Sequence, residues 1–199
     1  MARQNMNERN PIRRVTDNVY LFWTLLAWPA VYMFLQFFVL HGRFPYVPFT
    51  GDMSAWLLIL SLSITPLMLL LGPLPWLKAR RRYIGVASFS YALLHLAFWL
   101  KGAHWGDLIR SFKRFEIATG WVAIGILLLL ALTSNDWSVR KLGLMWKSLQ
   151  RWVYAAAILT LLHWVLTTDD RFAVVMYTLP LVILTVWRVL RAQGRASDV

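Results

Sequence analysis

The feature that most constrains the fold is an uninterrupted apolar stretch, residues 83–100, which reads YIGVASFSYALLHLAFWL. It carries no charged residue and contains a single histidine, His95. A helix of this length rises about 27 Å, close to the hydrocarbon thickness of a bilayer. Because lipid offers an imidazole no hydrogen-bond partner, His95 must find one inside the protein.

The composition agrees with a membrane protein. Of the 199 residues, 59% are hydrophobic and 15% are charged, whereas a soluble domain has about 45–50% apolar and about 25% charged residues. The chain has no cysteine, which excludes disulfides, iron–sulfur clusters and covalent c-type haem attachment. The net charge of +12 could suggest nucleic acid as a partner. Its distribution along the loops instead indicates a role in topology and contact with membrane lipid, and we expect no nucleic acid.

The apolar runs predict an all-α protein, an integral membrane six-helix bundle without an internal repeat. The predicted spans are 18–40, 53–75, 84–100, 117–133, 149–167 and 171–190. We expect three regions: a cytoplasmic N-terminal segment at 1–17, the six-span domain at 18–190 and a cytoplasmic tail at 191–199.

Basic residues predict the orientation. Fifteen Lys and Arg fall on the side that carries both termini, and six fall on the other side. By the positive-inside rule, both termini are expected to be cytoplasmic.

A second intramembrane histidine, His163, lies in the fifth predicted span. It is 14 residues past Leu149, and His95 is 11 residues past Ile84. Because the third and fifth spans run in the same direction, both side chains are expected at similar depth in the outer half of the bilayer. Two neutral imidazoles facing each other in a dry, aromatic-lined bundle suit axial ligation of a b-type haem iron.

Two further groups of residues belong to this hypothesis. Lys101 or Arg114 at the outer ends would pair with haem propionates. The candidate aromatic walls are Phe89, Tyr91, Phe98, Trp152, Tyr154 and Trp164. The alternative is that each histidine is a structural hydrogen-bond partner for a hydroxyl or a carbonyl, and spacing alone does not decide between the two readings.

Several motifs resemble the MsrQ (YedZ) family over about residues 50–167. In the third span they are Arg81-Arg82-Tyr83-Ile84-Gly85 and Tyr91-Ala92-Leu93-Leu94-His95-Leu96. Before it come Thr50-Gly51, Trp56 and Thr65-Pro66. After it come Lys113-Arg114, Ala131-Leu132-Thr133-Ser134, Arg140-Lys141-Leu142-Gly143, Trp146, Leu149, Arg151, Val153-Tyr154 and His163.

The resemblance implies membership of the ferric-reductase-like transmembrane superfamily. Its implied function is electron transfer through haem b in the bacterial inner membrane, from a flavin reductase or the quinol pool. The implied acceptor is a periplasmic molybdenum-cofactor methionine sulfoxide reductase, MsrP. On this reading the chain supplies electrons and does not itself repair methionine.

One departure from the family concerns a second haem. The family usually has histidine where this chain has Gln150, a position implicated in a second haem or in electron entry. An amide is a poor iron ligand, so the resemblance carries over His95 and His163 as ligands of one haem. Arg81, Arg82 and Arg151 are candidate contacts for a flavin such as FMN, a quinone or a propionate.

The remaining candidates have simpler explanations. His41 and His104 fall in predicted outer loops, and Asp52 is expected to be an outer-loop carboxylate. The basic cluster at 78–82 suits topology and anionic lipid as well as a flavin phosphate. Two rival functions stay open: a non-catalytic scaffold subunit of a larger membrane complex, and a stand-alone quinone or metal reductase.

Overall fold

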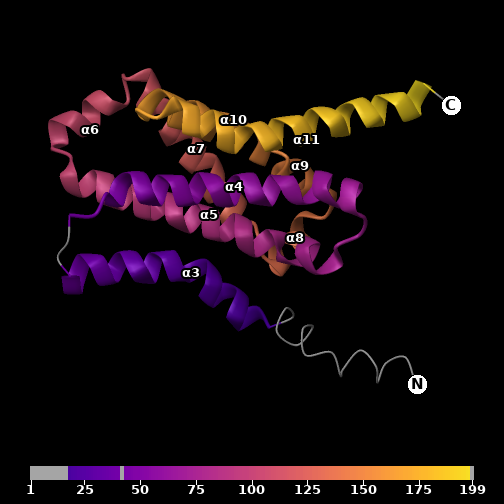
Figure 1. Ribbon diagram of the computed structural model, residues 1–199, viewed down its shortest axis with the longest axis horizontal. Helices are drawn as coiled ribbons and strands as arrows, with labels where there is room; N and C mark the ends of the chain where they lie inside the picture. The colour runs from indigo at the N-terminus through magenta and orange to yellow at the C-terminus, as the bar shows by residue number, and fades with distance from the viewer. Residues whose placement is uncertain (1–17, 41–42, 198–199) are drawn as a thin grey trace.

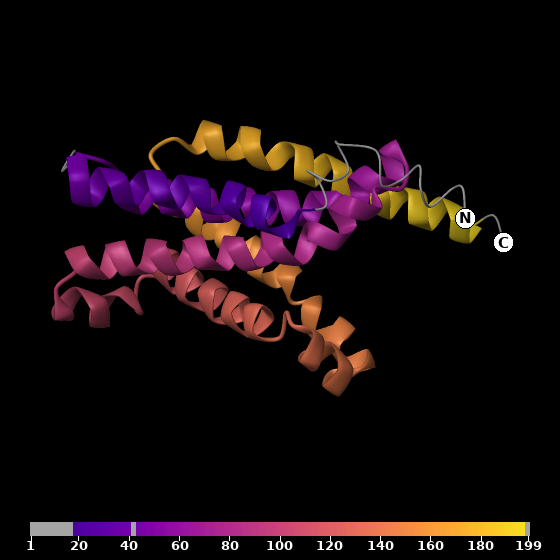
Figure 2. The same ribbon diagram turned by 90° about the horizontal axis from the view of Figure 1, so that it is seen from below.

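The computed structural model describes residues 18–40 and 43–197, in which helices are joined by short turns and there is no strand. Within these residues, six helical segments are sufficiently long and apolar to cross a membrane: Val19–Leu40, Tyr46–Leu71, Pro75–Gly102, Phe115–Leu132, Leu144–Thr167 and Arg171–Arg191. This confirms the predicted all-α, six-span bundle. The first described helix begins, and the last one ends, at the same end of the bundle (Figures 1 and 2).

The helices keep the order of the predicted spans. They are α3 (Val19–Leu35), the π-helix η1 (Gln36–Leu40), α4 (Tyr46–Leu71), α5 (Pro75–Gly102), α6 (Trp105–Ser111), α7 (Phe115–Leu132), α8 (Asp136–Leu142), α9 (Leu144–Gln150), α10 (Val153–Thr167) and α11 (Arg171–Ser197). The short helix α6 lies at one end of the bundle, and α8 and α9 lie at the other (Figure 1). Residues 1–17, the whole of the predicted cytoplasmic N-terminal segment, lie outside the described residues.

Two predicted spans begin too late in the sequence. Helix α4 begins at Tyr46, seven residues before the predicted start at 53, because Pro48 is accommodated in its first turn. Helix α5 begins at Pro75 rather than at 84, with proline in its first turn and the basic cluster continuing the helix. The two helices are separated at Gly72, whose φ of 90° favours glycine. Asp52 is therefore inside α4 and not in a loop.

The fifth span is interrupted, unlike the single helix predicted over 149–167. Helix α9 ends at Gln150, and α10 starts at Val153. Across the junction the backbone makes tighter i→i−3 bonds, from the N–H groups of Arg151, Trp152 and Tyr154. The sixth helix continues to Ser197, past the predicted tail boundary at 190.

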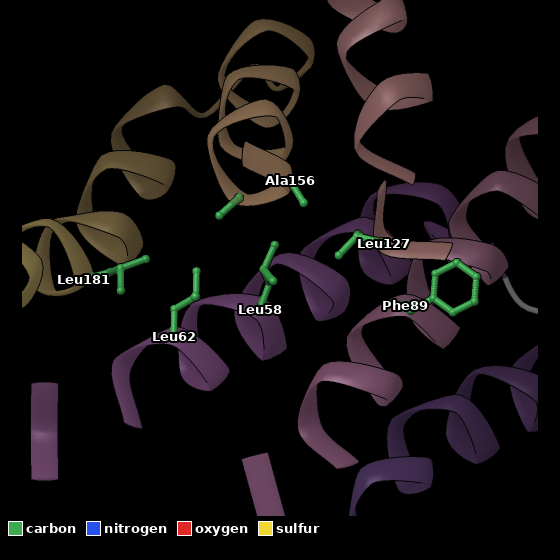
Figure 3. Close-up of a cluster of buried hydrophobic side chains, with 7 residues drawn as sticks. Leu58, Leu62, Phe89, Leu127, Ala156 and Leu181 are labelled. Atoms are coloured by element: carbon green, nitrogen blue, oxygen red, sulfur yellow. The ribbon is translucent and has the colours of Figure 1, made fainter. Parts of the chain in front are cut away.

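Two helical hairpins form the centre of the bundle. Helices α4 and α5 pack most extensively against each other, and so do α7 and α10. A buried hydrophobic cluster joins both pairs to α11 (Figure 3). Its members are Leu58, Leu62, Phe89, Leu127, Ala156, Ala157 and Leu181.

One side chain of α5 enters the backbone ladder of helix α3. The hydroxyl of Tyr91, on α5, donates to the carbonyl of Leu26 at 2.8 Å and accepts from the N–H of Ala30 at 3.0 Å. These two groups would otherwise pair with each other as i and i−4 in the helix. They flank Pro29, where a membrane helix tolerates a kink when a neighbour re-satisfies the backbone, and Figure 1 shows α3 bent along its length.

An ion pair joins α5 to α8 at the end of the bundle opposite α6. Arg82 Nη1 lies 2.6 Å from Asp136 Oδ1, and the Asp136 side chain is largely exposed. The hydrogen bond and the charge of Arg82 lower the pKa of the Asp136 carboxyl below its ordinary value of 3.8. A lowered carboxyl pKa adds stability above the ordinary pKa, and this stability is lost as the pH falls through the lowered value.

We therefore expect Asp136→Asn to lower the melting temperature slightly at pH 7, because exposed pairs contribute little. The difference from the wild type should shrink as the pH is brought down to about 3. Thermal unfolding in detergent at the two pH values measures this. A difference that stays constant with pH would contradict the assigned role of the Arg82 pair.

Candidate functional site

His95 is held by the hairpin of α4 and α5. Its Nδ1 lies 2.9 Å from the carbonyl oxygen of Val47, in the first turn of α4. A carbonyl can only accept, so in the neutral ring Nδ1 carries the hydrogen and donates it. The other nitrogen, Nε2, therefore keeps its lone pair for a metal ion.

His163 is held in the same way by α7 and α10. Its Nδ1 lies 2.6 Å from the carbonyl oxygen of Glu116, in the first turn of α7. The same argument leaves the Nε2 lone pair of His163 available. Such a bond from the second ring nitrogen to a backbone carbonyl typically orients metal-ligating histidines.

The two rings face one cavity from opposite hairpins. Their centroids are 6.2 Å apart, and their planes are inclined at 82°. A metal–imidazole nitrogen bond of about 2 Å plus about 1.2 Å from nitrogen to ring centre places two collinear rings about 6.4 Å apart. The observed separation therefore fits one metal ion between the two histidines, whose rings lie close together as their predicted similar depth requires.

A glycine makes room for each ring. A Cβ atom added to Gly51 would lie 2.9 Å from Nδ1 of His95, and one added to Gly120 would lie 2.9 Å from Nδ1 of His163. Separations this short do not occur for real Cβ atoms. Glycine is therefore required at both positions for the rings to reach their carbonyls.

The arrangement is duplicated, although no internal repeat was expected. In each hairpin the accepting carbonyl is followed by a threonine three residues later and a glycine four residues later: Val47, Thr50 and Gly51 in α4, and Glu116, Thr119 and Gly120 in α7. The histidine follows its glycine by 44 residues in the first hairpin and by 43 in the second. The repeated Thr-Gly dipeptide at this spacing was the sequence signal that could have revealed the pair.

The histidines line a cavity of about 510 Å³, within the range of about 300–1,000 Å³ typical of ligand sites. It lies toward the end of the bundle that holds α6, where α4 and α7 begin and α5 and α10 end. Small side chains open it next to the rings, namely Gly51, Ser54, Ala55, Ala92, Gly120 and Ala123. Leu127 belongs both to this lining and to the buried cluster, so the cluster closes the inner end of the cavity.

One polar atom on the cavity wall suggests an absent occupant. The hydroxyl of Thr160 is buried and has no hydrogen-bond partner among the described residues. It lies three residues before His163 on α10 and lines the same cavity. Because an unsatisfied buried hydroxyl costs about 1–3 kcal/mol, this placement fits a cavity that is filled by a ligand or by water.

The aromatic walls differ from those predicted. Trp164 lines the cavity as expected, together with Trp99 and Trp121, which the sequence did not single out. The other five predicted aromatics are not part of the lining. Phe89 is in the buried cluster, and Tyr91 holds α3.

The other three of those aromatics also have different surroundings. Phe98 stacks on Tyr46 with ring centroids 5.0 Å apart. Trp152 is exposed, and the Tyr154 hydroxyl accepts a hydrogen bond from Arg188 at 3.4 Å.

The basic residues predicted to pair with propionates lie outside the lining. The Lys101 ammonium sits 4.1 Å above the Phe37 ring, and Arg114 pairs with the Glu116 carboxylate at 2.7 Å. At the opposite end, Arg81 donates to the Thr65 hydroxyl at 3.2 Å, and Arg82 pairs with Asp136. Arg151 is exposed in the turn between α9 and α10.

Gln150 ties α9 to the end of α7. Its amide nitrogen donates to the carbonyl of Leu130 and to the hydroxyl of Thr133, both at 3.3 Å. Gln150 does not line the cavity that His95 and His163 share. These contacts are those of a structural bridge. Of the remaining histidines, His104 precedes α6 and does not line this cavity, while His41 lies outside the described residues.

The fold and the site together define a class: a multi-pass helical membrane protein with two intramembrane histidines facing one cavity. Residues 50–161 match the family described as "Ferric reductase like transmembrane component", a segment that includes His95 and ends two residues before His163. The chain therefore belongs to the ferric-reductase-like transmembrane family and, as its relatives show, to the MsrQ proteins within it.

The similar curated proteins carry the name "Protein-methionine-sulfoxide reductase heme-binding subunit MsrQ". The relative from Brucella anthropi is 30% identical, over 98% of this chain and 91% of its own length. Those from Brucella ovis and Brucella canis are each 33% identical, over 87% of this chain and 82% of their own length. No solved structure matches the chain.

Proposed function

We propose that this protein is a membrane cytochrome b that holds one haem between His95 and His163. The observation that carries the proposal is the paired geometry, with ring centroids 6.2 Å apart and each Nδ1 bonded to a backbone carbonyl. Haem iron accepts two axial imidazoles, and haem b needs no cysteine attachment. The names of the relatives, which describe a heme-binding subunit, support the same cofactor.

When bound, haem supplies a one-electron iron(III)/iron(II) couple. The protein contributes orientation and a dry environment. His95 and His163 bind the metal, and the carbonyls of Val47 and Glu116 fix their tautomer and direction. The lining is mostly apolar and includes Trp99, Trp121 and Trp164.

The direction of electron flow follows from the predicted topology. With both termini cytoplasmic, as the positive-inside rule predicts, the α6 end of the bundle faces outward, and the cavity lies toward that end. In a bacterial inner membrane this side is the periplasm. The relatives' names motivate an MsrP-like molybdenum methionine sulfoxide reductase as the acceptor.

Electron entry belongs to the opposite end. Arg81, Arg82 and Arg151 lie at that end, and so does Gln150, the family's histidine position. We propose a flavin such as FMN, or a quinol, as the donor contact at this end, and no second haem. The contacts of Gln150 with the end of α7 are compatible with the absence of a second haem, because its amide nitrogen acts in them as a hydrogen-bond donor and not as a metal ligand.

The function is tested by oxidation of the reduced protein by its acceptor. We expect purified, dithionite-reduced protein, freed of excess reductant, to be reoxidised when an MsrP-type reductase and a methionine sulfoxide substrate are added together under anaerobic conditions. The reduced-haem absorption band measures this, and omission of the sulfoxide is the control.

Two results would count against the proposal. A reduced band that persists with the complete mixture would contradict the proposed acceptor and favour a stand-alone quinone or metal reductase. Purified folded protein that contains no haem and co-purifies with other membrane subunits would favour the scaffold function. The observation that favours this alternative is glutamine at position 150, where the family has histidine.

A further inference from the structure

Each carbonyl that accepts from a histidine also accepts from a threonine. The Thr119 hydroxyl donates to Glu116 O at 2.8 Å, the same oxygen that lies 2.6 Å from Nδ1 of His163. The Thr50 hydroxyl donates to Val47 O at 3.1 Å, the same oxygen that lies 2.9 Å from Nδ1 of His95. Both threonines are buried, with 5% and 0% of their surface exposed.

A threonine bonded to the preceding turn is common in helices and by itself means little. In the described part of the chain, the hydroxyls of Thr24, Ser90 and Thr178 make similar local bonds to carbonyls that accept from neither His95 nor His163. The threonines at the site differ because their carbonyls are shared with the candidate ligands. The same sharing occurs in both hairpins, so a role confined to the local helix turn does not account for it.

Sharing has a predictable electronic effect. A carbonyl oxygen that already accepts one hydrogen bond is a weaker acceptor for the second when both donors compete for its lone-pair density. The hydrogen bond from Nδ1–H to the carbonyl is then weaker. The imidazole ring therefore has less electron density, and Nε2 becomes a less basic ligand. Hydrogen bonds to the ring nitrogen that does not bind the metal tune the basicity of a metal-bound histidine and the reduction potential of its metal.

We propose that Thr50 and Thr119 are positioning residues that set the reduction potential of the site by weakening the bonds from the histidines to the Val47 and Glu116 carbonyls. The inference rests on the proposed function, since it requires haem between His95 and His163. Removing either hydroxyl strengthens the histidine bond, makes the ligand more basic and favours iron(III). The reduction potential is then lower than in the wild type.

The two threonines are not equivalent. Thr119 gives its hydroxyl to Glu116 O, whereas Thr50 divides its hydroxyl between Tyr46 O at 2.7 Å and Val47 O at 3.1 Å. The shorter, undivided bond to the shared oxygen is that of Thr119. Its removal is expected to have the larger effect.

The test is a redox titration of haem-loaded protein. For Thr119→Val we expect the iron(III)/iron(II) equilibrium to move toward iron(III) by up to about tenfold, a drop of up to about 59 mV for one electron. Thr50→Val should produce a smaller drop. Thr119→Ser keeps a hydroxyl and should stay close to the wild type. Thr178→Val, which removes a local bond of the same i−3 type to a carbonyl that neither His95 nor His163 uses, is the matched control.

The outcomes separate this inference from the proposed function. A wild type without haem contradicts the proposed function itself. A haem-loaded wild type whose potential is unchanged in Thr119→Val, raised instead of lowered, or shifted equally in Thr178→Val, overturns the role of the threonines and leaves the haem site in place. If Thr119→Val does not load haem, the same criteria are applied to Thr50→Val.

Discussion

Replacing His163 with alanine is expected to lower the haem content of the purified protein by more than about tenfold, and His95→Ala should do the same. Loss of an outer-shell partner of a metal-bound histidine already costs about 10- to 100-fold in metal affinity or activity, and these changes remove the ligands themselves. Neither ring can replace the other, because each is anchored to its own hairpin. Haem extracted and counted per chain measures the effect.

The matched control is His104→Ala, which removes a histidine that does not line the cavity. It should keep the haem content of the wild type. All three variants should elute from size exclusion as folded protein, since they leave intact the hydrophobic cluster that joins the helices. Full haem retention in both His95→Ala and His163→Ala would contradict the assignment of the ligands.

The second large effect is expected from a single methyl group. Gly120→Ala places its Cβ atom 2.9 Å from Nδ1, 3.0 Å from Cε1 and 3.3 Å from Cγ of His163, so the ring must leave its position. Gly51→Ala makes the equivalent contacts with His95, at 2.9 Å and 3.1 Å from Nδ1 and Cε1. Overpacking of this kind costs about 1–3 kcal/mol, and we expect haem affinity to fall roughly tenfold or more.

Gly125→Ala is the control for this prediction. Gly125 lies on the same helix as Gly120, and a Cβ atom added there meets nothing within 4 Å. Alanine also favours a helix more than glycine does, so this variant should be as stable as the wild type or slightly more stable and keep its haem. Haem titration of the apo-proteins measures the haem affinity of all three variants. Equal affinity in Gly120→Ala and Gly125→Ala would contradict the close packing of His163 on α7.

The sequence was sufficient to predict the six spans and the meeting of the two histidines. Apolar runs long enough to cross a bilayer are the strongest signal that a membrane protein carries. An imidazole inside such a run is costly unless it is partnered, which singled out His95 and His163. Their similar depth then followed from the order and direction of the spans.

The walls of the cavity could not be predicted in the same way. A membrane helix is apolar on every face, so hydrophobic periodicity does not indicate which side faces the protein. Trp99 and Trp121 line the cavity while Phe89 and Phe98 do not, and nothing in the residue types separates them. The deciding factor is helix rotation, which is set by small residues such as Gly51 and Gly120 at the helix contacts.

The interruptions of the helices could not be predicted from the sequence either. The tight turn at Arg151 and Trp152 contains no proline or glycine, and the entry of Tyr91 into the ladder of α3 depends on a contact between distant segments. The Thr-Gly pairs at 50–51 and 119–120 were visible. Their role could not be inferred from the sequence, because it depends on the backbone carbonyl that lies next to each pair in the structure.

The first measurement is a dithionite-reduced minus air-oxidised absorption spectrum of the purified, folded wild-type protein, with the haem extracted and counted per chain. We predict a b-type spectrum with about one haem per chain, held by His95 and His163. A folded protein without haem would contradict this site, and two haems per chain would contradict the conclusion that the Gln150 side holds none.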